Sequence, residues 1–187
     1  EPTYLPDGDI AFVSTRCNRW VNCWYTQVGI IYRCDGDGRN IRQISANTEH
    51  DNTPWIMPDG RLMYMRWEYV DRSQVEYHAL WVMNPDGTGQ TIYFGNMHSW
   101  IAMLDAKPIP GTDQVVASFS PGHGMGEHMG YVTVVDPRRG PDDMDMTRRV
   151  SKTTYRDPYP LAEDLFLVAD NKGIRFLTGD GRAELIY

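Results

Sequence analysis

Histidine gives this chain its clearest chemical signal, because all five histidines fall in or beside segments that we expect to be long loops. An imidazole is a common protein ligand of divalent metals and can also act as an acid or base near neutral pH. His123 and His128 lie in a glycine-rich loop that matches no known metal-binding spacing, so histidines that only tie loops together remain the alternative. The candidate metal ligands are His50, His123 and His128.

A second hypothesis from the same residue types is acid–base catalysis on a polysaccharide that contains sugar acids. In this hypothesis His50 or His123 removes a proton and Tyr69 assists. Arg66 would neutralise the carboxylate of the sugar acid. The chain would then be a propeller-type polysaccharide lyase or hydrolase.

Four further residues are candidate ligand contacts, because a guanidinium can meet a carboxylate and an indole offers a flat stacking surface. Arg16 and Arg66 occupy the same place in two successive repeats, and the alternative for both is an ion pair with Asp51 or Asp105 between repeats. The alternative for the aromatic residues is packing of one loop on another. The four candidates are Arg16, Trp67, His98 and Trp100.

A sequence repeat must position these residues. Pro6, Pro58, Pro110 and Ala162 are each 52 residues apart, and a short apolar run follows each of them. Apolar runs of this length between Pro-Asp-Gly or similar turns predict buried strands. A fixed period of this size indicates one supersecondary unit stacked on copies of itself.

Each repeat has room for four strands, so the sequence predicts an all-β fold, a β-propeller of four-stranded antiparallel blades. Residues 1–187 form one propeller segment, with blades at about 1–48, 49–100, 101–153 and 154–187. We expect these four blades to be part of a ring of six to eight; four blades that close on themselves are the alternative. A helical solenoid is excluded because the 3.6-residue periodicity is missing.

The connections of such blades alternate between two faces of the disc. The tight Pro-Asp-Gly and Asp-Gly turns share one face, and the long connections share the other. All five histidines, four of the six tryptophans and both Cys17 and Cys23 fall on the long-loop side. Rigid strands that carry chemically rich loops on one side are typical of a binding or catalytic face.

Composition narrows the classes of partner. The net charge of −7 argues against a nucleic-acid surface, which needs clustered Lys and Arg. No apolar stretch approaches the roughly 18 residues of a membrane span, so none is expected. Cys17 and Cys23 lie in one loop and are candidates for a disulfide, which would imply an exported protein; two free thiols are the alternative.

The longer phrases resemble two related groups of proteins. The Pro-Asp-Gly turns and the strands after them are similar to the repeats of TolB-type propellers. A closer resemblance, to the propeller region of hydrazine synthase alpha-subunit-like proteins, runs along nearly the whole chain. It rests on residues 49–54, 65–69, 105–111 and 120–124, which read Glu-His-Asp-Asn-Thr-Pro, Met-Arg-Trp-Glu-Tyr, Asp-Ala-Lys-Pro-Ile-Pro-Gly and Ser-Pro-Gly-His-Gly.

The resemblance implies a large exported protein and an extracytoplasmic setting, periplasmic or secreted. In hydrazine synthase the chemistry belongs to c-type haems attached at Cys-x-x-Cys-His. This chain has no haem-attachment motif, since Cys17 and Cys23 are too far apart and neither is followed by histidine. Haem and hydrazine formation are therefore assigned to none of its residues.

The leading expectation is a propeller module of an exported multidomain protein, which binds a small molecule, a glycan, a divalent metal or a partner through its His- and Trp-rich loop face. The remaining blades or domains of a parent protein are the expected partners. A polysaccharide lyase or hydrolase and a structural scaffold in a multi-subunit complex are the alternatives.

Overall fold

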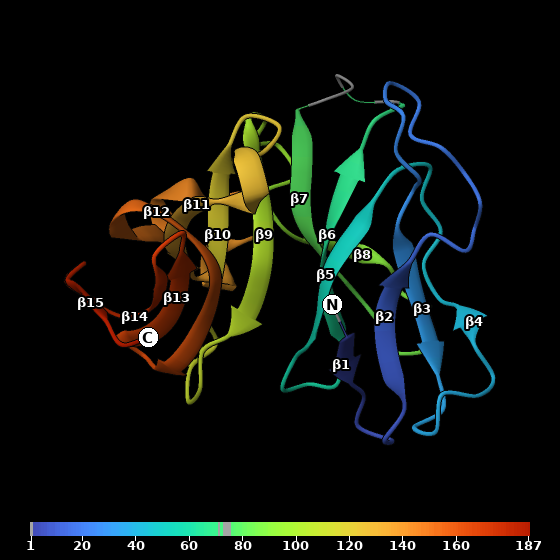
Figure 1. The fold of residues 1–187 in the computed structure, drawn as a ribbon, viewed down its shortest axis with the longest axis horizontal. Helices are drawn as coiled ribbons and strands as arrows, with labels where there is room; N and C mark the ends of the chain where they lie inside the picture. Colours follow the sequence, from blue (N-terminus) through green and yellow to red (C-terminus); the bar gives the residue numbers. More distant parts are fainter. Residues whose placement is uncertain (1, 71, 73–75) are drawn as a thin grey trace.

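The computed structural model describes residues 2–70, 72 and 76–187 (Figure 1). The described part is built of strands and three short 3-10 turns, and it has no α-helix and no helix long and apolar enough to cross a membrane. In chain order the elements are β1 (Pro2–Tyr4), β2 (Ile10–Ser14), β3 (Ile30–Cys34), β4 (Arg42–Gln43), β5 (Asp51–Ile56), β6 (Leu62–Glu68), β7 (Tyr77–Met83), β8 (Thr91–Phe94), β9 (Ile101–Pro108), β10 (Val115–Pro121), η1 (Gly126–His128), β11 (Gly130–Val135), η2 (Pro137–Arg139), η3 (Met144–Met146), β12 (Thr147–Ala162), β13 (Leu165–Asp170), β14 (Gly173–Thr178) and β15 (Ala183–Leu185).

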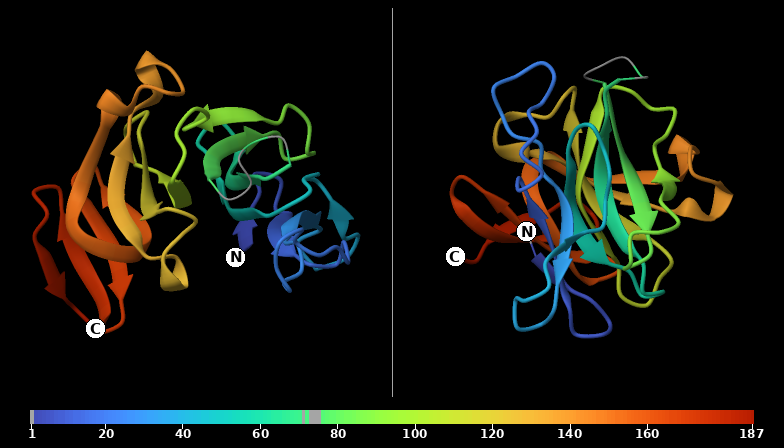
Figure 2. Two further views of the ribbon diagram at one scale, coloured as in Figure 1. Left: turned by 90° about the horizontal axis from the view of Figure 1, so that it is seen from above. Right: turned by 90° about the vertical axis from the view of Figure 1, so that its right-hand side faces the viewer.

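The strands form one sheet of four and one sheet of eleven. The first sheet has the order β1-β2-β3-β4, and its neighbours are antiparallel. The second has the order β15-β14-β13-β12-β11-β10-β9-β7-β6-β5, with β8 paired to β7. Seen from above, the strands follow one another around an arc from the blue end to the red end (Figure 2).

The expected division into four separate four-stranded sheets is therefore seen only for the first repeat. The second and third repeats are joined by a short parallel pairing of β7 with β9, at Tyr77 and Ile101. The third and fourth share β12, whose first half pairs with β11 and whose second half pairs with β13. No turn residue interrupts the chain near residue 153, so this strand runs through the expected boundary.

A β-bulge recurs at one position of the repeat. Thr53, Asp105 and Asp157 are spaced 52 residues apart and all have left-handed backbone, with φ of 55°, 56° and 48°. The strand pairing shifts its register at each of these places. A bulge bends and twists its strand, so the repeat encodes the same bend three times.

Apolar side chains fill the spaces between successive repeats. Leu62 and Tyr64 pack with Ile31 of the first repeat. Val132 packs with Phe166 between the third and fourth repeats. Burial of these side chains stabilises the stack by about 25 cal/mol for each Å² of apolar surface.

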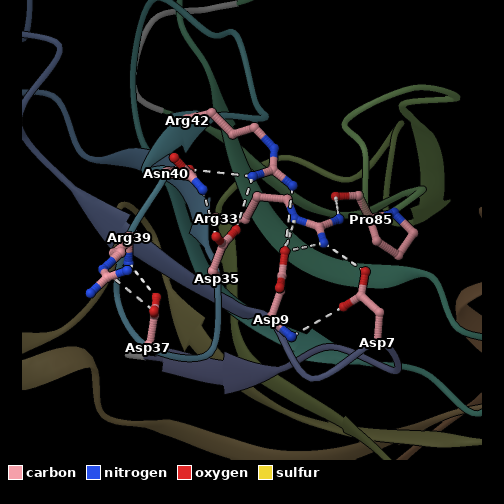
Figure 3. Close-up of polar contacts among 9 residues, drawn as sticks. All are labelled: Asp7, Asp9, Arg33, Asp35, Asp37, Arg39, Asn40, Arg42 and Pro85. Carbon is pink, nitrogen blue, oxygen red and sulfur yellow. Dashed lines mark hydrogen bonds and ion pairs between the residues drawn. The ribbon is translucent and has the colours of Figure 1, made fainter.

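The Pro-Asp-Gly turns and the His- and Trp-rich loops lie at opposite ends of the strands, as the repeat predicts (Figure 1). The β11–β12 connection differs from the expected tight turn, because it runs over residues 136–146 and contains η2 and η3. At the tight-turn end, Arg33 ties the first repeat to the second (Figure 3). Its guanidinium donates to the carboxylates of Asp7 and Asp9 and to the carbonyl oxygen of Pro85, the last at 2.9 Å. This network stabilises the contact between the first two repeats at the end opposite to the long loops.

Candidate functional site

The long-loop face contains a cavity of about 420 Å³, which we call the His/Trp cavity. Its walls come from the loop after β2, from the start of β5, from β6, β7 and β9, and from the β10–β11 connection. Four of the five histidines line it, so the expectation that His50, His123 and His128 gather on one face agrees with the geometry. The lining residues are Val21, Cys23, Trp24, Thr26, His50, Asn52, Met65, Trp67, His78, Ala102, Leu104, His123 and His128.

Trp67 organises the His/Trp cavity. It ends the buried run of β6 and is only 4% exposed. Its indole stacks on His50 and on His78, with ring centroids 5.8 Å and 5.4 Å apart, and lies 4.5 Å from the ring of His123. One indole therefore fixes the orientation of three imidazoles from three segments of the chain.

His78 and His123 form a direct pair. Nε2 of His78 lies 2.8 Å from Nδ1 of His123, a distance typical of one shared N–H proton. His78 is 4% exposed, and burial lowers its pKa to about 3, helped by the neighbouring charge of His123. His78 is thus neutral at physiological pH. The sequence reasoning missed it as a site residue, although its strand pairing places it directly opposite Trp67.

His50 is held by the backbone. The amide of Gly29 donates to its Nδ1 at 3.0 Å, and burial lowers the pKa of His50. A neutral imidazole whose Nδ1 accepts a hydrogen bond carries its proton on Nε2. His50 is therefore an N–H donor, and it has no free nitrogen lone pair for a metal or for proton abstraction.

The expected metal set is accordingly not assembled. Within the described residues, no three His, Cys, Asp or Glu side chains come close enough to hold an ion. His50, His123 and His128 share a cavity without forming a ligand cluster. The physical reason at His50 is the Gly29 amide, which already occupies its Nδ1.

Arg66 forms an ion pair with Asp51, which was the alternative to a role in ligand binding or catalysis. Its Nε donates to Asp51 Oδ1 at 2.9 Å, and the same guanidinium reaches Gln90 at 2.6 Å and lies over the ring of Trp81. The pair joins β5 to β6 within one repeat, whereas the sequence hypothesis placed it between repeats. Arg66 is not part of the cavity lining, so this arrangement does not present it to a ligand.

The other candidate residues lie around the cavity rather than in its walls. Tyr69 packs edge-on against Trp67 at 5.5 Å. The guanidinium of Arg16 lies over the rings of Phe12 and Tyr32, at 5.7 Å and 5.9 Å. Neither residue lines the His/Trp cavity, and both support neighbouring aromatic side chains.

His98 and Trp100 also lie outside the His/Trp cavity. Nε2 of His98 donates to the carbonyl oxygen of Asp142 at 2.7 Å, which ties two loops together. Trp100 is 58% exposed and has left-handed backbone, with φ of 65°. For His98 the contact fits the loop-packing alternative, whereas the ligand-binding expectation for the exposed Trp100 stays a prediction.

Cys17 and Cys23 are free thiols rather than a disulfide. Residues 20–27 form a small hairpin in which Trp20 bridges to Gln27. Cys23 sits at the tip of this hairpin and lines the cavity, whereas Cys17 lies outside its base and donates to the carbonyl of Val28 at 3.3 Å. The hairpin therefore separates the two sulfur atoms.

A second, more polar cavity of about 400 Å³ adjoins the first along the bulged strands. It shares Asn52, Leu104 and His128 with the His/Trp cavity. The bulge residues Asp105 and Asp157 line it, and the amide of Asp105 donates to the hydroxyl of Thr53 at 3.2 Å. The sequence suggested Asp105 only as an ion-pair partner of an arginine and did not point to Thr53 or Asp157, although their 52-residue spacing was a usable signal.

No family model matches this chain, and no curated protein shows a significant match. Several solved structures, in contrast, are similar to this chain. Hydrazine synthase from Kuenenia stuttgartiensis matches with a TM-score of 0.78 and 19% identity, over 96% of this chain and 27% of that chain. An oligogalacturonate lyase in complex with manganese matches with a TM-score of 0.59 and 16% identity, over 95% of this chain and 47% of that chain.

A gluconolactonase candidate matches with a TM-score of 0.58 and 12% identity, over 100% of this chain and 59% of that chain. The chain thus spans less than two thirds of each of these neighbours. The expected resemblance to hydrazine synthase is confirmed at the level of structure. At these identities the likenesses show the fold alone, and that fold is of the β-propeller type.

Proposed function

We propose that this chain is a propeller module of an exported multidomain protein and that it binds a small ligand in the His/Trp cavity. The convergence of four histidines and two tryptophans on one cavity of about 420 Å³ carries the proposal. Ligand sites of proteins are concave, mostly apolar and equipped with a few convergent polar groups. The resemblance of the sequence to exported proteins supports the extracytoplasmic setting.

We further propose that the four repeats are blades of a ring of six to eight, completed by other blades of a parent protein. The third repeat buries Val132 and Val134 against the fourth. At the same strand positions the fourth repeat exposes Ile174 and Phe176, which are 41% and 36% exposed. An apolar sheet face of this kind matches the interfaces between the repeats and is a docking surface for a further blade.

The cavity favours binding over the two alternatives. A pure scaffold would fill this space with packed side chains, whereas the space is open. A lyase acting on sugar acids needs a cation for the carboxylate, and Arg66 is engaged by Asp51. Of the four catalytic candidates, only His50 and His123 line the cavity.

A divalent metal is the second candidate ligand, because His78 and His123 bring two imidazole rings together. Their nitrogens are 2.8 Å apart and would have to move to about 3.3 Å to share one tetrahedral ion. Elemental analysis of the purified protein tests this candidate. Stoichiometric metal that is lost on His123→Ala would support it, and metal-free protein would leave the pair as a hydrogen bond.

A fragment screen by ligand-observed NMR tests the main proposal, with two neighbouring loop residues as a matched pair. Trp24 lines the cavity, and Tyr25 beside it is 95% exposed and does not. We expect single-ring fragments to bind the natural chain and Tyr25→Ala but to lose affinity for Trp24→Ala. Fragment binding that both variants retain would place the site elsewhere and overturn the proposal.

A further inference from the structure

The His/Trp cavity lacks fixed charge. Of the residues that line it in the described part of the chain, none is Asp, Glu, Lys or Arg. Its titratable side chains are Cys23 and four histidines, of which His50 and His78 have lowered pKa values because they are buried. Asp51, next to His50 in the chain, is neutralised by Arg66.

The walls of the cavity are largely apolar. Val21, Met65, Ala102 and Leu104 provide aliphatic surface, and Trp24 and Trp67 provide aromatic surface. A charged group that enters such a space loses part of its hydration without meeting an opposite charge on the cavity walls, which is unfavourable. An uncharged molecule of the same shape avoids this cost and gains from apolar burial.

The polar groups of the cavity have a defined direction. Because Gly29 occupies Nδ1 of His50, the neutral ring offers an N–H at Nε2 and no acceptor. His78 and His123 bond each other at 2.8 Å through one nitrogen of each ring, and the other ring nitrogen of His78, Nδ1, is buried without a hydrogen-bond partner among the described residues. The fixed donor at His50 therefore favours a ligand that carries a hydrogen-bond acceptor.

We propose that the His/Trp cavity selects an uncharged molecule of one or two rings with a hydrogen-bond acceptor, and that it rejects carboxylates and sugar acids of similar size. This inference rests on the proposed ligand-binding function and names its ligand class. The volume of about 420 Å³ lies at the small end of the range for ligand pockets. A site that binds acidic sugars would need a cationic side chain in its walls, which the described lining of this cavity does not contain.

Benzamide and benzoate test the ligand class, because they have nearly the same shape and differ in charge. Their dissociation constants would be measured at pH 7.5 by NMR titration with the natural chain, Trp24→Ala and Tyr25→Ala. We expect benzamide to bind at least about tenfold more tightly than benzoate, which corresponds to about 1.4 kcal/mol. Trp24→Ala should weaken benzamide and Tyr25→Ala should not.

The outcomes separate the two proposals. Benzoate binding that equals or exceeds benzamide binding, and that depends on Trp24, would overturn the ligand class and leave the binding function standing. Failure of both compounds to bind in a Trp24-dependent way would overturn both proposals for ligands of this size. His50→Phe keeps a ring beside Trp67 but removes the donor, and it should weaken benzamide by about two- to tenfold. Unchanged affinity in this variant would contradict the donor assignment.

Discussion

Acidification should destabilise this protein through His78, the most deeply buried imidazole of the cavity. Its folded pKa of about 3 lies far below the ordinary value of 6.5. Between these two values the unfolded chain binds more protons than the folded one, so the free energy of unfolding falls as the pH falls. From pH 7 to pH 5 this linkage amounts to about 2 kcal/mol, and a folded pKa one unit higher changes that figure little.

Urea unfolding at pH 7 and pH 5 measures this effect, with His78→Phe as the comparison. Phenylalanine can keep the stacking on Trp67 but cannot titrate. We expect the natural chain to lose about 2 kcal/mol more than His78→Phe over this range, because all other titrating groups are common to both. A second non-titrating variant, His78→Asn, guards against a packing effect peculiar to phenylalanine. Equal acid losses in the three proteins would refute the assignment of His78 as a buried neutral imidazole.

Three further predictions concern the scaffold and the loop thiols. Arg66→Met should lower the free energy of unfolding, measured in urea, by about 3–5 kcal/mol, because it leaves the fully buried Asp51 carboxylate without its partner. The double variant Arg66→Met with Asp51→Leu should recover most of this loss. No recovery in the double variant would contradict the ion-pair argument. Gly130→Ala should unfold at a clearly lower temperature than Gly126→Ala. A Cβ at Gly130 would lie 2.6 Å from strand backbone, whereas a Cβ at Gly126 would meet nothing within 4 Å. Equal melting temperatures would contradict the close approach of the neighbouring strand to Gly130. Native-state maleimide labelling followed by mass spectrometry should modify Cys23 before the other two thiols, and a Cys17–Cys23 disulfide in the purified chain would contradict the hairpin geometry.

Much of the architecture could be predicted from spacing alone. The 52-residue interval identifies the repeat, and the position of tight turns and long loops at opposite ends follows from it. The sheet boundaries could not be predicted, because β12 passes from the third repeat to the fourth without a turn residue. The bulges at Thr53, Asp105 and Asp157 share the interval, but these residue types do not by themselves signal left-handed backbone.

The sequence predicts which face carries most of the histidines, but not how their rings are held. The sequence places His50 and His123 on one face, and the structure brings them to one cavity. The sequence cannot show that a backbone amide donates to Nδ1 of His50, because this contact depends on where Gly29, just before β3, lies in the fold. His78 was missed for a related reason, since only the register of β6 with β7 sets it opposite Trp67.

The distribution of charge links the scaffold to the proposed function. The chain carries a net charge of −7, yet the walls of the His/Trp cavity, as far as the structure describes them, hold no carboxylate and no guanidinium. Arg33 and Arg66 form ion pairs with carboxylates, and these ion pairs hold strands and turns together. Because these charges stabilise the propeller elsewhere, the cavity can keep the neutral rings of His50 and His78 against the indole of Trp67, an environment that suits an uncharged ring.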